Sequence, residues 1–250
     1  MTIKKKFIVL ASARTGSTML CRTLNEHPSI TCYGELFINN EEVPWMLDKT
    51  IQRGLPSLYA SKDAREKDPV RFINDVMTYH QETDIFGFKL MISQNESVLR
   101  WVISQPDWQI INLYRSNLLS VYGATKVARA SRQSHVEIGE RVNQIKVHFD
   151  ATEFNNLLQF NQTRRRQVDQ MLVEKQHNYF PLDYLALSSE SGIDQVLNYL
   201  DPTPKKELTP QLAKRHDWNV LDRFANPEVV EKYLIQHNLC EWLVEQPFKN

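Results

Sequence analysis

The sequence has few cysteines and no long apolar run. Its three cysteines are Cys21, Cys32 and Cys240, an odd and scattered set without metal-ligand spacing. This usage suits a reducing compartment, and we therefore expect a cytoplasmic protein. No apolar run approaches the roughly 20 residues that a membrane-spanning helix needs, so we expect no stable membrane insertion.

The sequence also lacks a net charge, because 30 lysines and arginines balance 30 aspartates and glutamates. Proteins that bind nucleic acids usually carry a basic field, so we expect no nucleic-acid partner. Any anion site must come from local placement. The apolar run Phe7–Ala11 is too short for a signal peptide, and Arg14 follows it closely. A chain of 250 residues fits one α/β domain, and we predict that residues 1–250 form a single domain.

The most informative stretch is FIVLASARTGSTML, residues 7–20. The apolar run Phe7–Leu10 predicts a buried strand, and an amphipathic run that begins near Ser17 predicts a helix. Such a helix points its unpaired N–H groups and the positive end of its dipole at the space above the strand. Gly16 permits close backbone approach, Ser17 and Thr18 add hydroxyl groups, and Arg14 adds a positive charge. The stretch therefore predicts a phosphate-binding loop.

This loop differs from the longer glycine-rich loop of ATPases and nucleotide kinases, which ends in Gly-Lys-Ser/Thr. Here no lysine follows Gly16. The pattern favours a phosphorylated nucleotide that is not handled as magnesium ATP. Two alternatives remain open at this stage: a nucleotide or small-molecule kinase with a degenerate loop, and a non-catalytic nucleotide-binding module.

Strand and helix patterns alternate along the chain, which predicts an α/β fold with a central parallel sheet flanked by helices. Residues 36–67 have an irregular pattern, and we interpret them as a lid or an acceptor-side insertion. Residues 201–250 are predicted to form a helical C-terminal segment. The predicted strands cover residues 2–11, 29–33, 85–91, 108–114 and 183–187. The predicted helices cover residues 17–25, 69–80, 96–104, 117–130, 152–176, 191–200 and 228–237.

Three cations stand at or near the ends of predicted strands: Arg14, Lys89 and Arg115. Ligands of open parallel sheets bind beyond the carboxyl ends of the strands. The three side chains are therefore expected to converge on a poly-anion.

At these residues the sequence resembles the sulfotransferases that use 3'-phosphoadenosine 5'-phosphosulfate, most closely the bacterial carbohydrate sulfotransferases of nodulation factors and glycolipids. The resemblance covers about the first 130 residues and is fainter in residues 183–187 and 212–226. It implies a fold like that of the P-loop nucleotide hydrolases. The segments that carry it are SARTGST (12–18), NEHP (25–28), GE (34–35), GFKLM (87–91) and YRSNLL (114–119).

The resemblance implies a role for each part of the site. Arg14 and the loop residues Thr15, Gly16, Ser17 and Thr18 would hold the 5'-phosphate and the sulfate. Arg115 would bind the 3'-phosphate, Glu35 would accept the proton of the acceptor hydroxyl, and Lys89 would stabilise charge on the transferred group. The donor is a co-substrate and no metal is required. The acceptor is expected to be a hydroxyl of a carbohydrate or small glycoconjugate.

The sequence departs from the family at Ala124, where related sequences usually have a serine. Ser120 or Thr125 is a candidate to supply the missing hydrogen bond to the 3'-phosphate.

The sequence offers further candidates besides these residues. Lys214 and Arg215 are further candidates for contact with the nucleotide. Glu41 and Glu42 are alternatives to Glu35 as the base. The basic run Arg164–Arg166 is interpreted as a solvated face of a long helix. The acceptor's identity and the oligomeric state, including a homodimer, stay open.

Overall fold

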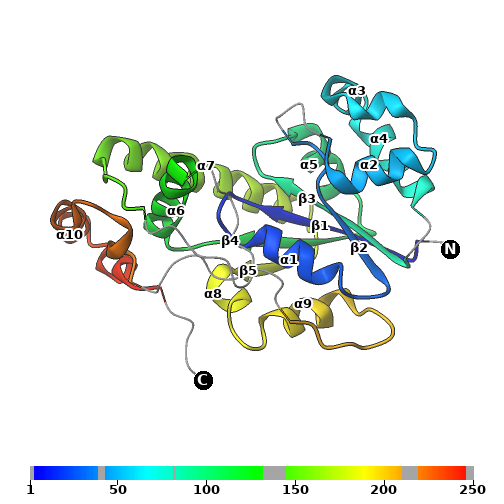
Figure 1. Cartoon of the computed structure of the whole chain (residues 1–250). Helices are drawn as coiled ribbons and strands as arrows, with labels where there is room; N and C mark the ends of the chain where they lie inside the picture. The colour runs from blue at the N-terminus through cyan, green and yellow to red at the C-terminus, as the bar shows by residue number, and fades with distance from the viewer. Residues whose placement is uncertain (1–2, 39–42, 81–82, 132–144, 210–218, 246–250) are drawn as a thin grey trace.

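A computed structural model describes residues 3–38, 43–80, 83–131, 145–209 and 219–245 of the chain. Its centre is a five-stranded sheet with the order β2-β3-β1-β4-β5, in which every neighbouring pair is parallel (Figure 1). This confirms the predicted α/β fold. The strands are β1 (Lys5–Ala11), β2 (Ile30–Glu35), β3 (Ile85–Met91), β4 (Trp108–Tyr114) and β5 (Tyr179–Asp183).

The predicted helices are present, with differences of one or two residues at their ends, and further short helices lie at residues 45–52, 62–67 and 184–187. Asp68, Asn95 and Asp150 cap three of them by accepting a backbone N–H in the first turn. The α-helices are α1 (Ser17–Leu24), α2 (Trp45–Gln52), α3 (Lys62–Lys67), α4 (Pro69–Tyr79), α5 (Glu96–Ile103), α6 (Leu118–Ser131), α7 (Ala151–Glu174), α8 (Tyr184–Leu187), α9 (Gly192–Leu200) and α10 (Pro227–Gln236). Three short 3-10 helices are η1 (Ser57–Ala60), η2 (Leu221–Arg223) and η3 (Cys240–Leu243).

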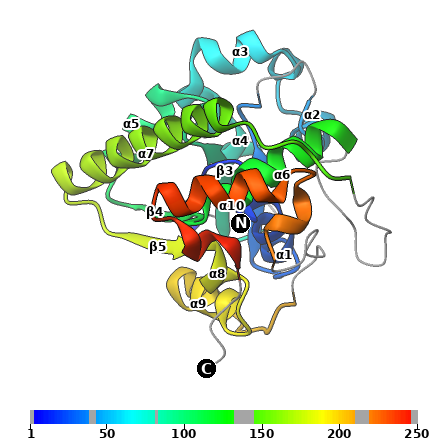
Figure 2. The ribbon, with the colours of Figure 1, turned by 90° about the vertical axis from the view of Figure 1, so that its left-hand side faces the viewer.

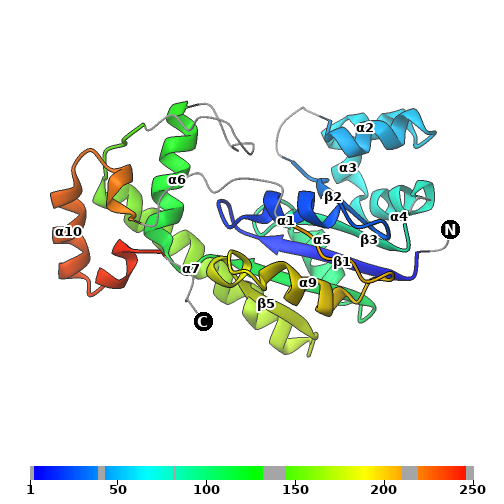
Figure 3. The same ribbon diagram turned by 60° about the horizontal axis from the view of Figure 1, so that its bottom comes forward.

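The sheet is apolar on both faces, as expected of a parallel sheet covered by helices on both sides. Side chains of β1 alternate between the two faces. Ile8 and Leu10 join a core with α4, α5 and α7, whereas Phe7 and Val9 join a second core with α1 and α9. Figure 3 shows α1 and α9 together near the sheet. Because both faces are buried, the ligand site is restricted to an edge or an end of the sheet.

A third apolar cluster lies outside the sheet and joins α6, the start of α7, η2 and α10. Aromatic rings dominate it, with Tyr122 stacked on Phe224 and Phe149 packed edge-on against both Phe224 and Tyr122. Figure 2 shows α10 and η3 in front of the sheet. The cluster confirms the predicted helical C-terminal part and holds it near the strand ends, next to α6.

Residues 36–67, whose sequence pattern is irregular, contain α2, η1 and α3, and Phe37 and Tyr59 of this segment are buried in the core with α4. One prediction about local structure was wrong. The predicted strand at 183–187 is helix α8, because the Asp183 carboxylate caps it by accepting the Leu185 N–H at 2.8 Å. The strand precedes it as β5, an edge strand that tolerates Pro181.

Within the described residues, none of the helices combines the length and the apolar character that crossing a membrane requires.

Candidate active site

The phosphate-binding loop connects β1 to α1 and is held in one shape by its own contacts. The Thr15 hydroxyl donates to the Ser12 carbonyl at 2.9 Å, and both Arg14 (φ 63°) and Gly16 (φ 82°) have left-handed backbone conformations. A Cβ atom on Gly16 would lie 3.2 Å from the Tyr184 ring. Glycine is therefore favoured at position 16 both by its backbone angles and by the close ring.

The N-terminus of α1 opens at this loop. No side chain of the described residues caps it, so its first N–H groups keep the donor capacity that helix starts offer to anions. Thr15 and Ser17 are buried within the turn. The predicted strand, loop and helix are thus confirmed, and phosphate binding by the loop stays a prediction.

Glu35 and Lys89 form an ion pair on one side of the loop. Lys89 Nζ lies 2.7 Å from Glu35 Oε1 and donates to Thr18 Oγ1 at 3.0 Å. The two residues are opposite each other in the β2–β3 ladder, beyond an irregularity between Cys32 and Glu35. Gly34 lies in that irregularity with a φ of 66°, which is typical of a bulge that re-aims a side chain.

The two members of this pair differ in exposure. The Lys89 side chain is 6% exposed, whereas that of Glu35 is 26% exposed. The Gln94 amide donates to the second carboxylate oxygen, Glu35 Oε2, at 2.5 Å. Glu35 is therefore held in place by two neighbours and is still accessible, as a base that meets an incoming substrate must be.

Two buried cysteines lie behind this pair. Cys21 and Cys32 are both unbridged and buried in the core beneath α1. The Cys32 thiol donates to Cys21 and lowers the pKa of the Cys21 thiol. Burial raises the pKa of the Cys32 thiol well above its usual range. Since neither sulfur is exposed, they act as packing for the site and not as nucleophiles.

Arg115 lies on the other side of the loop and is 8% exposed. Its Nη1 donates to the Arg14 carbonyl at 2.8 Å, and its guanidinium lies 4.1 Å from the centre of the Tyr184 ring. Its Nε and Nη2 both donate to the carboxylate of Glu245, the first at 2.7 Å. Two N–H groups of the planar guanidinium are therefore already bound to a carboxylate, in the geometry that an arginine also uses for a phosphate.

The start of α6 adds polar groups beside Arg115. The Asn117 side chain accepts the Ser120 N–H at 2.9 Å and donates to the Trp242 carbonyl at 2.9 Å. The buried Ser120 hydroxyl has no hydrogen-bond partner among the described residues. By contrast, the Thr125 hydroxyl donates to the Val121 carbonyl of its own helix at 2.7 Å. Of the two candidates near Ala124, Ser120 has the hydroxyl that is not engaged within its own helix.

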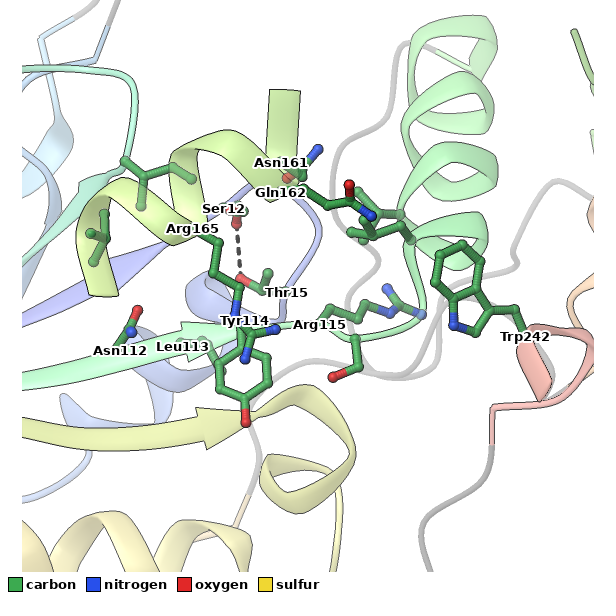
Figure 4. A pocket seen from close by; sticks show the side chains of 15 residues that line it. Ser12, Thr15, Asn112, Leu113, Tyr114, Arg115, Asn161, Gln162, Arg165 and Trp242 are labelled. Carbon is green, nitrogen blue, oxygen red and sulfur yellow. Dashed lines mark hydrogen bonds between the residues drawn. The ribbon is translucent and has the colours of Figure 1, made fainter. Parts of the chain in front are cut away.

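A cavity of about 190 Å³ opens beside Arg115, over the ends of β1 and β4 (Figure 4). Its lining includes Thr15 of the loop, Tyr114 and Arg115 of β4 and the turn that follows it, and Trp242 of η3. Arg165 of α7 stacks on the Tyr114 ring, with 3.7 Å from the guanidinium carbon to the ring centre. The cavity therefore joins the loop to aromatic and cationic groups suited to a phosphorylated ring compound.

The site residues all fall in the part of the chain that matches a known family. A family model described as Stf0 sulphotransferase matches residues 6–137. The chain belongs to this family. The matched residues run from β1 past the end of α6 and include the loop, Glu35, Lys89 and Arg115. Membership in a family of sulfotransferases favours this enzyme class over the kinase alternative.

Other comparisons are more distant. The crystal structure of a sulfotransferase from Alicyclobacillus acidocaldarius is similar with a TM-score of 0.47 and 14% identity, over 95% of this chain and 98% of that chain. The sulfotransferase domain of the Synechococcus PCC 7002 olefin synthase has a TM-score of 0.39 and 12% identity, over 80% of this chain and 74% of that chain. No curated protein matches the chain.

The structure of this sulfotransferase places two of the predicted cations, Lys89 and Arg115, against the loop that carries the third, Arg14. Lys89 contacts the first turn of α1 through Thr18, and Arg115 contacts the loop carbonyl of Arg14. Four other candidates, Glu41, Glu42, Lys214 and Arg215, lie outside the described residues.

Two contributions to the sulfotransferase site were missed from the sequence. The run Arg164–Arg166 was interpreted as a solvated face, and Arg165 is indeed 46% exposed, but its side chain also lines the cavity. Its spacing of three and seven residues from the buried Val168 and Leu172 places all three on one helical face, and this periodicity is the signal that could have identified it. Glu245 has no comparable signal, because its partner Arg115 is 130 residues away.

Proposed function

We propose that this sulfotransferase moves the sulfuryl group of 3'-phosphoadenosine 5'-phosphosulfate to a hydroxyl of a carbohydrate or small glycoconjugate, in the cytoplasm. One observation carries the proposal: two buried cations contact the phosphate loop from opposite sides, Lys89 through Thr18 and Arg115 through the Arg14 carbonyl. A donor with two separated anionic groups fits this arrangement, since one end meets the loop and Lys89 while the other meets Arg115.

The residues present fit the donor nucleotide. The N–H groups at the start of α1, with Arg14, would hold the 5'-phosphate and the sulfate oxygens, as helix starts hold anions. Arg115 would bind the 3'-phosphate with the fork that now binds a carboxylate. The unengaged Ser120 hydroxyl is suited to supply the bond that Ala124 lacks. No role for a metal enters this proposal.

When bound, the nucleotide supplies the sulfuryl group. Glu35 would accept the proton of the acceptor hydroxyl as the bond between the acceptor oxygen and sulfur forms. Lys89, 2.7 Å from Glu35, would stabilise the negative charge that builds up as the bond from sulfur to the 5'-phosphate oxygen breaks. The products are the sulfate ester and adenosine 3',5'-bisphosphate. Positioning and charge stabilisation supply most of the catalysis in such in-line displacements.

The acceptor would approach from the β2 side of the loop, where Glu35 retains its exposed carboxylate. The segment 36–67 follows Glu35 directly in the chain, which supports the proposal that it forms part of the acceptor side. Phe37 and Tyr59 of this segment pack in the core, so the acceptor contacts would come from other side chains.

A transfer assay tests the proposed function. The protein is incubated with the donor carrying radioactive sulfur and with panels of sugars, glycolipids, phenols and lipids. We expect label in a carbohydrate-containing product and stoichiometric release of adenosine 3',5'-bisphosphate. Transfer of phosphate from magnesium ATP to the same acceptors, without sulfate transfer, would contradict the proposal. Binding of the bisphosphate without transfer to any acceptor would favour a non-catalytic nucleotide-binding module.

A further inference from the structure

Glu245 is almost completely buried, which is unusual for a charged side chain. Its side chain is 1% exposed and accepts two hydrogen bonds from Arg115. A second buried guanidinium, that of Arg223, lies 3.9 Å from Glu245 Oε2. A carboxylate and a phosphate offer an arginine fork the same kind of planar pair of oxygens.

Arg223 belongs to the same neighbourhood as Ser120. Arg223 Nη1 donates to the Ser120 carbonyl at 3.1 Å, and its side chain is 2% exposed. The Ser120 hydroxyl is buried and has no hydrogen-bond partner among the described residues. Two buried guanidinium groups thus flank the Glu245 carboxylate, and Ser120, whose carbonyl accepts from one of them, carries the unengaged hydroxyl.

The segment that carries Glu245 is held by packing of Trp242 and Leu243 against the third apolar cluster and by hydrogen bonds to its backbone. Val220 donates its N–H to the Leu243 carbonyl at 2.9 Å, Asn117 donates to the Trp242 carbonyl, and Val244 makes an isolated bridge with Asn219. Val244 itself is 52% exposed. Trp242 of the same segment lines the cavity beside Arg115, so movement of this segment would change both the anion position and the cavity.

We propose that Arg115, Arg223 and Ser120 form one anion subsite and that the Glu245 carboxylate occupies it in place of the donor's 3'-phosphate until the nucleotide displaces it. This inference rests on the proposed function, because it takes the 3'-phosphate as the competing ligand. It assigns a phosphate-binding role to Arg223 and makes Glu245 an internal competitor of the donor. Apparent donor affinity is then reduced by the fraction of molecules in which Glu245 holds the subsite.

Calorimetric titration of the full chain with adenosine 3',5'-bisphosphate and with adenosine 5'-phosphate tests the inference. Glu245→Gln removes the competing charge. If the open form is about 10% populated, the variant binds the bisphosphate about tenfold more tightly, while its affinity for the monophosphate is unchanged. Glu241→Gln, at an exposed position of η3, is the matched control and binds both nucleotides as the wild type does. Arg223→Met weakens binding of the bisphosphate selectively.

A structural role for Glu245 gives different results. In that case Glu245→Gln lowers the thermal midpoint and leaves affinity for the bisphosphate equal or weaker, which overturns the inference while the wild type still binds the bisphosphate. Failure of the wild type and all variants to bind the bisphosphate overturns the proposed function together with the inference.

Hydrogen exchange of the wild-type protein keeps the test decisive if the Glu245 variant does not fold. Saturation with adenosine 3',5'-bisphosphate should increase exchange at Val220 and at residues 242–245, while adenosine 5'-phosphate should not. Unchanged or greater protection of these amides in the presence of saturating bisphosphate would overturn the displacement of Glu245.

Discussion

Two ion pairs flank the phosphate loop, and they differ in the chain segments that they join and in the exposure of their carboxylates. The Glu35–Lys89 pair joins neighbouring positions of adjacent strands, and its carboxylate remains 26% exposed. The Arg115–Glu245 pair joins segments 130 residues apart, and its carboxylate is 1% exposed. In the first pair, we expect the accessible carboxylate of Glu35 to meet the acceptor. In the second pair, we expect the guanidinium of Arg115 to bind the donor.

This difference indicates that one pair serves proton transfer and the other serves donor binding. A carboxylate fixed by a lysine and the Gln94 amide, yet open to solvent, suits proton transfer to and from a substrate. An arginine held by a carboxylate from a distant segment suits a binding step that first separates the pair. Four substitutions test whether catalysis and donor binding divide between the two pairs in this way.

The largest effect is expected from Glu35→Gln. The variant keeps the shape of the side chain but cannot accept the acceptor's proton, so kcat should fall by about 10²–10⁴-fold. Calorimetric affinity for adenosine 3',5'-bisphosphate should change little. Glu26→Gln, at an exposed position at the end of α1, serves as the control. Transfer at the wild-type rate by Glu35→Gln would remove Glu35 as the base.

Lys89→Met is expected to have the next largest effect. Loss of one preorganised cation at the transferred group should lower kcat by about 10²–10³-fold. Lys126→Met is a matched control. Lys126 Nζ forms an ion pair with Glu153 Oε2 at 2.6 Å, and this pair lies away from the site. If kcat stays constant and only KM for the donor rises, Lys89 is a binding residue. That result would contradict the assignment of catalysis to the Glu35–Lys89 pair.

Arg115→Lys should affect binding more than chemistry. Lysine keeps the charge but loses the two-pronged fork, so affinity for the bisphosphate should fall by about 10–100-fold, as expected for hydrogen bonds to a charged group. Affinity for adenosine 5'-phosphate should stay nearly constant. Arg100→Lys is the control, since Arg100 makes a similar two-bonded contact with Glu96 on an exposed helix face. Equal losses for both nucleotides would contradict a 3'-phosphate role.

The smallest effect separates two neighbouring hydroxyls. Ser120→Ala should reduce affinity for the bisphosphate by about 2–10-fold, the value of one hydrogen bond. Thr125→Ala should have no effect, because the Thr125 hydroxyl is engaged within α6. The reverse order in a calorimetric titration would assign the missing bond to Thr125 instead.

Much of the fold, and the positions of the loop, Lys89 and Arg115 at the ends of strands, could be predicted from the sequence. The strands β1, β3 and β4 are rich in apolar residues, and strand ends in a parallel sheet must meet at one edge. Strand β5 was misplaced because Pro181 interrupts its pattern and Asp183, read as the beginning of the strand, instead ends it and caps a helix. A short stretch of sequence predicts its secondary structure only when most of its residues belong to one helix or strand. The stretch around Asp183 instead contains the end of a strand and the start of a helix.

The contacts that close the site could not be predicted in the same way. Glu245 reaches both Arg115 and Arg223 through the packing of α6, η2 and η3, which joins distant parts of the chain. No periodicity marks an acidic residue as buried when its partner lies 130 residues away. Exposure of a charged residue is the ordinary expectation, and only tertiary structure overrides it.

Titration of the wild-type protein with three nucleotides tests the central claim most directly. Calorimetry with adenosine 3',5'-bisphosphate, adenosine 5'-phosphate and magnesium ATP measures which anions the two sides of the loop accept. We predict that the bisphosphate binds most tightly, that removal of its 3'-phosphate weakens binding at least about tenfold, and that magnesium ATP binds weakly. Tight binding of magnesium ATP, with no preference for the 3'-phosphate, would contradict the account.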